Sequence, residues 1–265
     1  MPGLLSGKIA VITGGGGAMG GEQCSLFASE GASVCVVDNR LEKAEERSNL
    51  IIKEGGKALP YGLDVRDQSE WAKLVEKVES EFGHINILCN NAGANFRVSF
   101  EDQTLEQFNQ IIEVGLTGTF LGIKAVIPSM KKAGEGVILN MGSLASIRPG
   151  GGSPGYAAQK MGMVGINRSA AGSFAKYNIR SVIISPGHVD TPFLRESNPH
   201  SPNEWDTSIA NPKNYNQRKD GTPLGRLQVP DDLAQAFLFA ASGNASMITG
   251  SMITCLLYTS DAADE

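Results

Sequence analysis

A glycine-rich turn near the start of the chain constrains the fold more than any other feature. An apolar segment, residues 8–12, reads as a buried strand and runs into the turn, residues 13–20, whose sequence is TGGGGAMG. A helical stretch follows to residue 30, and a second apolar segment, residues 33–37, leads directly to Asp38. This order of strand, glycine turn, helix, strand and acid is typical of a dinucleotide-binding βαβ unit.

Such a unit binds a dinucleotide mainly through its backbone. Glycines let N–H groups approach a pyrophosphate, and the start of the helix adds the positive end of its dipole. Asp38, eighteen residues after Gly20, would accept a hydrogen bond from a ribose 2′-hydroxyl and repel a 2′-phosphate. The sequence therefore predicts NAD, with NADP less favoured, although Arg40 weakens this preference. The candidate cofactor contacts in this unit are Gly14, Gly16, Gly17, Met19, Gly20 and Asp38.

A second group of residues indicates acid–base chemistry. Tyr156 and Lys160 are four residues apart and share one face if this stretch is helical, and Ser143 lies thirteen residues before Tyr156. A phenol with an ordinary pKa of about 10 is a poor base at neutral pH, but a nearby ammonium group lowers that pKa. A serine hydroxyl beside the phenol would hold a substrate oxygen. We take Ser143, Tyr156 and Lys160 as candidate catalytic residues; the alternative is an exposed pair on a helix.

The remaining sequence alternates strand-like and helical segments. This pattern predicts one α/β domain over residues 1–254, a single-domain Rossmann-like, doubly wound parallel sheet in a three-layer αβα arrangement. Further strands are expected at 87–89, 136–141 and 180–185. Helices are expected near 18–30, 41–54, 67–82, 104–132, 155–177 and 230–242.

Taken in order, these motifs resemble the classical short-chain dehydrogenase/reductase family from about residue 5 to about residue 254. The turn resembles the family's T-G-x-x-x-G-x-G signature, NNAG at 90–93 its N-N-A-G turn, and PGHVDTP at 186–192 its P-G-x-V-x-T-P segment. The resemblance implies further cofactor contacts, namely Asp64 and Val65 at the adenine edge, Asn91, Ala92 and Gly93 beside the cofactor, Pro186, Gly187, Val189 and Thr191 at the nicotinamide, and Tyr156 and Lys160 themselves.

The resemblance also implies an activity. Hydride would pass between a nicotinamide cofactor and a secondary alcohol or ketone, and no metal is expected. Tyr156 would be the general base or acid, Lys160 would lower its pKa and hold the nicotinamide ribose, and Ser143 would hold the substrate oxygen. The alternatives are an acyl-chain or steroid ketone reductase of the same family, and a non-catalytic nucleotide-binding protein on the same scaffold.

Two positions depart from the family pattern inside the expected site. Ala18 replaces the middle glycine of the signature, for which we expect weaker or slightly shifted cofactor binding. Gly115 replaces an asparagine that in the family bends a helix and holds a water linking the lysine to solvent. Three outcomes are open: water alone fills the space, a neighbouring polar group replaces the amide, or the enzyme is slow. Our hypothesis is the first, with turnover reduced but not lost.

Residues 193–224, the lid segment, hold several prolines among many polar residues and form the longest irregular stretch. Long loops of this kind often cover a site. The candidate substrate contacts are Phe193, Leu194, Trp205 and Tyr215, with simple loop packing as the alternative. Arg148 and His188 are further candidates, for which a solvated loop position and a structural role, respectively, are the commoner interpretations.

Composition excludes several classes of partner. A net charge of −5 does not favour nucleic acid. No continuous apolar stretch of about 18 residues is present, so no membrane span is expected, and no signal peptide is evident. Cys24, Cys35 and Cys89 are scattered, as expected of reduced core thiols in a cytoplasmic protein.

The last eleven residues, 255–265, read CLLYTSDAADE and resemble a translated sequencing adapter. On this interpretation the natural end of the chain is missing, and with it the family's last strand and C-terminal tail. In the family that the chain resembles, the helices near 104–132 and 155–177 pair with their copies across a two-fold axis. Here they carry small residues such as Gly162, Gly165 and Gly172, so the resemblance implies a homodimer. A tetramer is doubtful for this sequence and stays open for a full-length natural protein.

Overall fold

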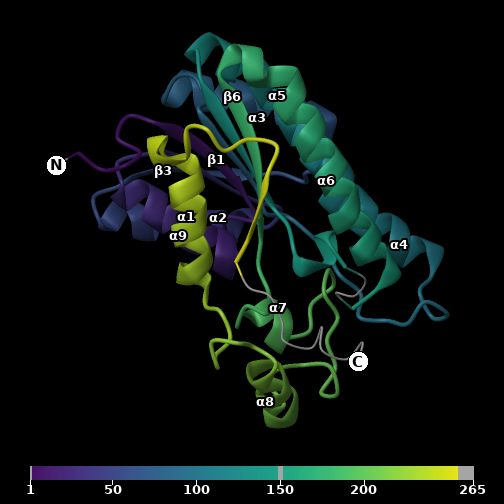
Figure 1. Cartoon of the computed structure of the whole chain (residues 1–265). Coiled ribbons are helices and arrows are strands. Elements are labelled where there is room, and N and C mark those ends of the chain that lie inside the picture. The colour runs from purple at the N-terminus through teal and green to yellow at the C-terminus, as the bar shows by residue number, and fades with distance from the viewer. Residues whose placement is uncertain (1, 149–151, 256–265) are drawn as a thin grey trace.

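A parallel sheet in the strand order β3-β2-β1-β4-β5-β6-β7 forms the middle layer of the molecule (Figure 1). The structure is a computed structural model that describes residues 2–148 and 152–255. The strands within these ranges are β1 Ile9–Thr13, β2 Ser33–Asp38, β3 Lys57–Gly62, β4 Ile87–Asn90, β5 Gly136–Met141, β6 Ile179–Ser185 and β7 Met252–Thr254.

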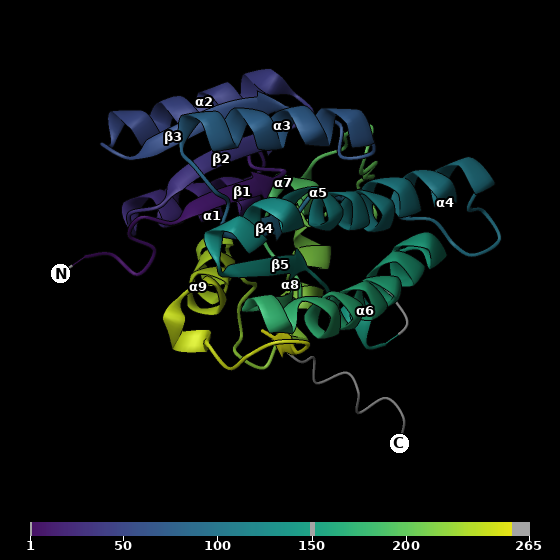
Figure 2. The same ribbon diagram turned by 90° about the horizontal axis from the view of Figure 1, so that it is seen from above.

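Helices cover both faces of the sheet, so the molecule has three layers (Figure 2). One face carries α1 Ala18–Ser29, α2 Leu41–Lys53 and α9 Pro230–Ala241. The other carries α3 Gln68–Glu81, α5 Gly118–Ala133 and α6 Pro154–Phe174. The short helix α4 Leu105–Ile112 joins α5 through a π-helical turn, Glu113–Thr117, and α6 ends in a 3₁₀ turn, Ala175–Tyr177. These findings confirm the predicted α/β fold.

The strands are apolar on both sides because both faces of the sheet are covered. In β1, Ala10 and Ile12 pack with α1 and α9, whereas Ile9 and Val11 pack with α3 and α5. Successive side chains of a strand point to opposite faces, so one run of apolar residues supplies two cores. The continuous apolar segments seen in the sequence are explained by this arrangement.

The strand order reverses at β1, which pairs with β2 on one side and β4 on the other. Loops that leave the carboxyl ends of β1 and β4 therefore diverge, and ligands of open α/β sheets bind in the resulting crevice. The turn at 14–17 and the segments at 91–97, 142–148 and 186–191 all follow strands at this edge. The predicted site residues are brought to one end of the sheet by this topology.

A buried polar ladder runs across the sheet on the α6 side. The Asn90 amide donates to Asn140 (2.9 Å), the Asn140 amide donates to Asn167 of α6 (3.2 Å), and the Ser181 hydroxyl donates to Asn167 (2.7 Å). The Asn167 amide in turn donates to the Ser251 carbonyl just before β7 (3.4 Å). The ladder links β4, β5, α6, β6 and the start of β7.

Two sequence expectations need correction. The last strand, expected to be missing, is present as β7, where Met252 pairs with Ile183 of β6; the tail beyond residue 255, including the adapter-like string, lies outside the described residues. The lid segment is not wholly irregular: α7 Pro192–Arg195 overlaps its start, and α8 Pro212–Asp220 lies within it. Both helices lie beyond the carboxyl ends of the strands (Figure 1).

The helical stretch Leu105–Ala133 is long and apolar enough, by length and composition, to cross a membrane. Charged residues interrupt the stretch, so it contains no continuous apolar run of the length that the sequence expectation required. Half of its most apolar window is buried within the fold, and Val126 and Met130 pack fully buried against the sheet. In this structure the stretch is a core element. Buried core helices often meet the same criteria of length and composition as a membrane span.

Candidate active site

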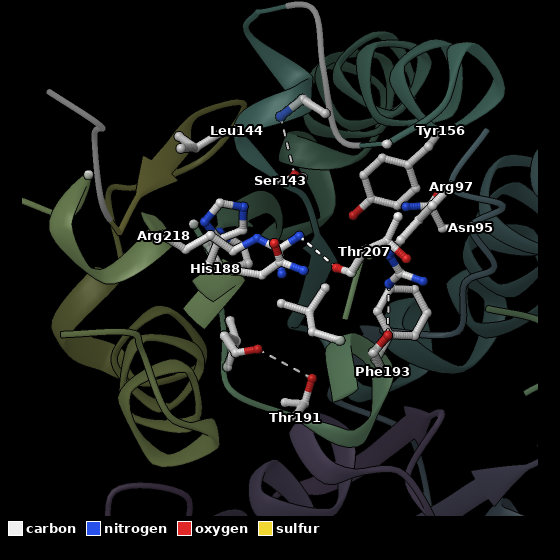
Figure 3. A pocket seen from close by; sticks show the side chains of 18 of the residues that line it. Asn95, Arg97, Ser143, Leu144, Tyr156, His188, Thr191, Phe193, Thr207 and Arg218 are labelled. Atoms are coloured by element: carbon white, nitrogen blue, oxygen red, sulfur yellow. Dashed lines mark hydrogen bonds between the residues drawn. The ribbon is translucent and has the colours of Figure 1, made fainter. Parts of the chain in front are cut away.

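A cavity of about 910 Å³ opens at the carboxyl end of the sheet, between the strand ends and the lid segment (Figure 3). Two of the candidate catalytic residues, Ser143 and Tyr156, line it. The predicted cofactor contacts that line it are Met19, Pro186, Gly187, Val189 and Thr191. The cavity therefore joins part of the expected cofactor site to the expected acid–base site.

The start of α6 positions the tyrosine. The Ser153 hydroxyl caps the helix by accepting from the Tyr156 N–H (3.3 Å), and Pro154 occupies the first turn, where its missing N–H costs nothing. Tyr156 lies in this first turn and Lys160 one turn later, which confirms the predicted helical spacing. The Lys160 Nζ atom lies 5.4 Å from the centre of the Tyr156 ring.

Lys160 is buried, with 5% of its surface exposed. Its ammonium donates to the Met141 carbonyl at the end of β5 (2.6 Å). Burial lowers the pKa of Lys160 to about 7, because a charged amine is disfavoured away from water. The lysine is thus held between α6 and β5, directly behind the tyrosine.

The phenol of Tyr156 has a raised pKa in this structure. Burial raises the pKa, while a hydrogen bond with the Ser143 side chain and the positive charge of Arg97 both lower it. The sequence assigned the lowering to Lys160, whose ammonium is directed to a carbonyl instead. Arg97, which carried no sequence signal, therefore acts on the same phenol.

Ser143 follows β5 and begins a 3₁₀ turn, Leu144–Ser146. Its hydroxyl oxygen accepts from the Ala145 N–H (3.2 Å), and its own N–H donates to the Ser146 hydroxyl (3.3 Å). The same hydroxyl is hydrogen-bonded to the Tyr156 phenol. The serine and the tyrosine thus face the same space.

The glycine turn approaches its neighbours closely. Gly14 has a φ of +64°, which favours glycine. A side chain at Gly20 would begin 2.3 Å from the Gly14 carbonyl oxygen. The Gly16 N–H donates to Asp38, which is 6% exposed (3.2 Å). The turn and the acid that closes it are therefore one unit, as the sequence predicts.

This unit has the features that a dinucleotide requires. A side chain at Gly16 would begin 2.6 Å from the Lys43 Cβ atom and 3.0 Å from an Asp38 carboxylate oxygen, so glycine lets the turn approach both α2 and the acid. Ala18 is the first residue of α1 and is half-buried. Arg40 approaches the Asp38 carboxylate at 3.6 Å with most of its side chain exposed. Asp38 therefore presents a carboxylate with one nearby cation at the ribose end.

The Asp64 carboxylate is bound by a neighbour. The Arg66 side chain donates to both of its oxygens (2.9 and 2.6 Å), and this hydrogen bonding lowers the pKa of Asp64. Val65 is buried, and its carbonyl accepts from the Trp71 indole (2.9 Å). In this structure the aspartate is engaged with Arg66 at the position where an adenine edge was expected.

The NNAG turn after β4 is tied to β1. The Asn91 and Ala92 N–H groups both donate to the Thr13 hydroxyl (3.0 and 3.2 Å). The Asn91 amide also donates to Gln23 of α1 (2.9 Å), while a side chain at Gly93 would meet little. These bonds tie the turn after β4 to β1 and α1, and the contacts of Asn91, Ala92 and Gly93 with a cofactor stay a prediction.

The segment 186–191 is held by one glutamine. The Gln228 side chain accepts from the Gly187 N–H (2.8 Å), and its backbone pairs with His188 and Asp190 on either side of Val189. The Thr191 hydroxyl donates to the Val189 carbonyl (3.4 Å). Pro186, Gly187, Val189 and Thr191 are thereby presented together along one side of the cavity.

The side chain of Gln159 occupies the space beside Gly115. Gly115 lies in the π-helical turn, and a side chain built on it would begin 2.6 Å from the amide carbon of Gln159. Gln159 is 1% exposed, and its amide nitrogen has no hydrogen-bond partner. Of the three outcomes left open by the sequence, the structure therefore favours a neighbouring polar group over the water that we had hypothesised.

The cavity also contains residues that sequence reasoning missed. Asn95, Arg97 and Arg218 line it, as do the two residues given only as weaker candidates, Arg148 and His188. No sequence motif marks Arg97 or Arg218, because a loop after β4 and helix α8, far apart along the chain, bring them to the same cavity (Figure 3). Of the predicted lid contacts, Phe193 and Leu194 line the cavity, whereas Trp205 and Tyr215 do not.

Comparison with known proteins shows which family the chain belongs to. Residues 8–202 match the family model described as short chain dehydrogenase. The chain is 35% identical to a 2,5-dichloro-2,5-cyclohexadiene-1,4-diol dehydrogenase of Sphingobium indicum (94% of this chain, 95% of the relative). It is 34% identical to a 3-oxoacyl-[acyl-carrier-protein] reductase of Thermotoga maritima (94% and 96%). It is 31% identical to a cyclopentanol dehydrogenase of a Comamonas species (94% and 95%). With the glycine turn, the Ser143–Tyr156–Lys160 geometry and the sheet order already established, the chain belongs to the short-chain dehydrogenase family.

Proposed function

We propose that the protein is an NAD-dependent dehydrogenase of secondary alcohols, with Ser143, Tyr156 and Lys160 as its catalytic residues. Membership of the family makes it an oxidoreductase acting on an alcohol or a ketone. The observation that carries the finer proposal is the shared cavity, in which the Ser143 hydroxyl and the Tyr156 phenol face the same space beside the segment 186–191.

Each catalytic side chain has one task in this proposal. Ser143 holds the substrate oxygen, and Tyr156 takes its proton in oxidation or returns it in reduction. Lys160 supports the tyrosine from behind, while Arg97 and Ser143 lower the pKa that burial raises. With the phenol's pKa raised, the proton donor form prevails at neutral pH, and the base form is favoured as pH rises.

The cofactor would lie between the glycine turn and the segment 186–191, and it would supply the hydride acceptor or donor. Glycines at 14, 16, 17 and 20 present backbone, and Asp38 supports NAD over NADP by accepting from a ribose hydroxyl. Asn91, Ala92 and Gly93 border the same crevice. Arg40 works against the NAD preference because it faces the same carboxylate.

The relatives support ring alcohols as the first substrates to try. Two of the three named relatives act on five- or six-membered ring alcohols. The third is an acyl-carrier-protein ketone reductase, so reduction of an acyl-chain ketone is the second candidate within the family. A steroid ketone reductase and a non-catalytic nucleotide-binding protein remain the alternatives to be tested.

The test is Tyr156→Phe in the purified chain, assayed with NAD and cyclohexanol, and with NADH and cyclohexanone. Loss of the phenol oxygen should lower kcat by about 10²- to 10⁴-fold, with NADH binding by fluorescence titration changed less than about twofold. Turnover that survives in Tyr156→Phe would overturn the catalytic assignment. NADH binding by the native chain without turnover of any alcohol or ketone would favour the non-catalytic alternative.

The oligomeric state is also a proposal. Gly165 and Gly172 of α6 face open space, and Met161 of α6 and Phe120 of α5 are large, exposed apolar side chains. These features support a homodimer through α5 and α6. A monomeric mass by light scattering at micromolar concentration would contradict it. Cys24, Cys35 and Cys89 are free and buried, which supports a reducing, cytoplasmic setting.

A further inference from the structure

Three guanidinium groups line the cavity from three separate segments. Arg97 comes from the loop after β4, Arg148 from the segment after the 3₁₀ turn at 144–146, and Arg218 from α8 of the lid segment. Asp206 is the one carboxylate among the described lining residues. Arginines therefore outnumber carboxylates among the described lining residues, although the whole chain has a net charge of −5.

Arg97 is held in place by neutral groups. Its guanidinium donates to the Ser201 hydroxyl (2.8 Å) and to the Pro202 and Phe193 carbonyls (3.1 and 2.7 Å). It also lies over the Phe193 ring, 5.1 Å from the ring centre (Figure 3). These contacts fix the position of Arg97 without cancelling its charge, and that charge acts on the Tyr156 phenol.

Arg218 lies close enough to Arg97 for the two charges to repel. Its guanidinium donates to the Thr207 carbonyl (3.0 Å), so α8 and the preceding loop hold it at the cavity (Figure 3). Burial and then repulsion from Arg218 lower the pKa of Arg97 to about 10. A bound anion near both guanidinium groups would be attracted to each of them.

His188 completes this side of the cavity as a neutral group. Burial, followed by repulsion from Arg218 and Arg148, lowers its pKa to about 4, so the imidazole is uncharged at neutral pH. Two apolar side chains of the lid, Phe193 and Leu194, line the same cavity. A ligand here therefore meets guanidinium groups, apolar side chains and the Ser143–Tyr156 pair within one cavity.

We propose that the substrate is a secondary alcohol that carries a carboxylate, which Arg97 and Arg218 bind while its hydroxyl carbon lies at Ser143 and Tyr156. The inference rests on the proposed function and adds the substrate's charge to it. Arginine forks match the planar geometry of a carboxylate. The Asp206 carboxylate in the same lining disfavours a dianion more than a monoanion, which favours a carboxylate over a phosphate ester.

The experiment compares isosteres that differ in charge. The kcat/KM of the full chain with NAD is measured for 4-hydroxycyclohexanecarboxylate and for its carboxamide, at neutral pH and low salt. A charge-assisted hydrogen bond predicts a preference for the acid of about 10- to 100-fold. Equal kcat/KM values for the two compounds would overturn the inference while leaving the alcohol dehydrogenase intact.

Two variants locate the preference. Arg218→Gln should reduce the acid-to-amide ratio by about tenfold or more, whereas Lys213→Gln, which removes the same charge from an exposed position of the same helix, should leave the ratio unchanged. An unchanged ratio in Arg218→Gln, in a variant whose thermal melting matches the native chain, also overturns the inference.

If no alcohol is oxidised, the proposed function fails, and binding decides the inference separately. Calorimetric titration of the native chain with the acid and with the amide should then give tighter binding of the acid, lost in Arg218→Gln. Equal affinities, or no binding of the acid at millimolar concentration, would overturn it.

Discussion

The glycine turn and the lid segment close the same site from opposite ends, and they are built by different means. The turn is joined to the sheet by short links between adjacent strand ends, such as Gly16 to Asp38 and Asn91 to Thr13. The lid segment has one buried large apolar side chain, Ile209. It is held instead by side chains that donate to backbone carbonyls, as Arg97 does to Phe193 and Asn203 does to Leu194.

This difference has an energetic meaning. Close backbone packing at the turn leaves no room for an added atom, whereas a loop with little buried apolar surface opens at low cost. The cofactor end is therefore expected to be intolerant of change, and the lid end to be tolerant except where a side chain faces the cavity. Four substitutions test this contrast.

Gly20→Ala should have the largest effect. The added carbon would lie 2.3 Å from the Gly14 carbonyl oxygen, so the backbone of the turn has to move. We expect NADH affinity to fall by about 100-fold or more and stability by about 1–3 kcal/mol, measured by fluorescence titration and denaturant unfolding. The control is Gly243→Ala, where the added carbon meets nothing. Unchanged NADH affinity in Gly20→Ala would mean that the turn tolerates substitution as well as the lid does.

Gly115→Asn probes the packing behind Lys160. The Cβ atom of the new asparagine would lie 2.6 Å from the amide carbon of Gln159, and the two side chains would collide. Overpacking of this kind predicts a loss of about 1–3 kcal/mol in unfolding free energy. The double variant Gly115→Asn/Gln159→Ala, which removes the obstacle, should recover most of the loss. A single variant as stable as the native chain would show that Gln159 yields easily.

Asp38→Asn should change cofactor choice by about tenfold. The amide keeps an oxygen to accept from the Gly16 N–H, but the repulsion of a 2′-phosphate is lost. The ratio of NADPH to NADH affinity should therefore rise. Arg40→Gln removes the nearby cation and should lower that ratio. The same direction of change in both variants would contradict the assignment of Asp38 to the ribose.

The smallest effects are expected at the lid. Trp205 is 62% exposed and lies outside the cavity lining, so Trp205→Ala should change kcat/KM by less than about twofold. Phe193→Ala is the matched comparison, because that ring lines the cavity and supports Arg97. It should raise KM by roughly fivefold. Equal effects of the two variants would show that lid residues inside and outside the cavity lining contribute alike.

Most of the cofactor end was predictable because its signals are local. The order from β1 to Asp38 and the spacing of Tyr156 and Lys160 depend on residues close together along the chain. Helix α8 escaped prediction because its residues 212–220 are almost all polar and show no apolar face. Strand β7 escaped because three residues, paired only with β6, carry little pattern.

Arg97 and Gln159 were missed for a different reason. Arg97 acquires its place from contacts with Phe193 and Ser201, about a hundred residues later in the chain. Gln159 acquires its place from the space left by Gly115, which a single sequence does not reveal. The catalytic roles themselves stay predictions until they are measured.

The ladder of Asn90, Asn140 and Asn167 has a consequence for how the sheet assembles. A slip of β5 by one residue would turn Asn140 to the opposite face, leaving two amides buried without partners at about 1–3 kcal/mol each. Apolar strand residues tolerate such a slip far better, because one aliphatic side chain substitutes for another. The ladder therefore destabilises compact forms in which the central strands pair out of register.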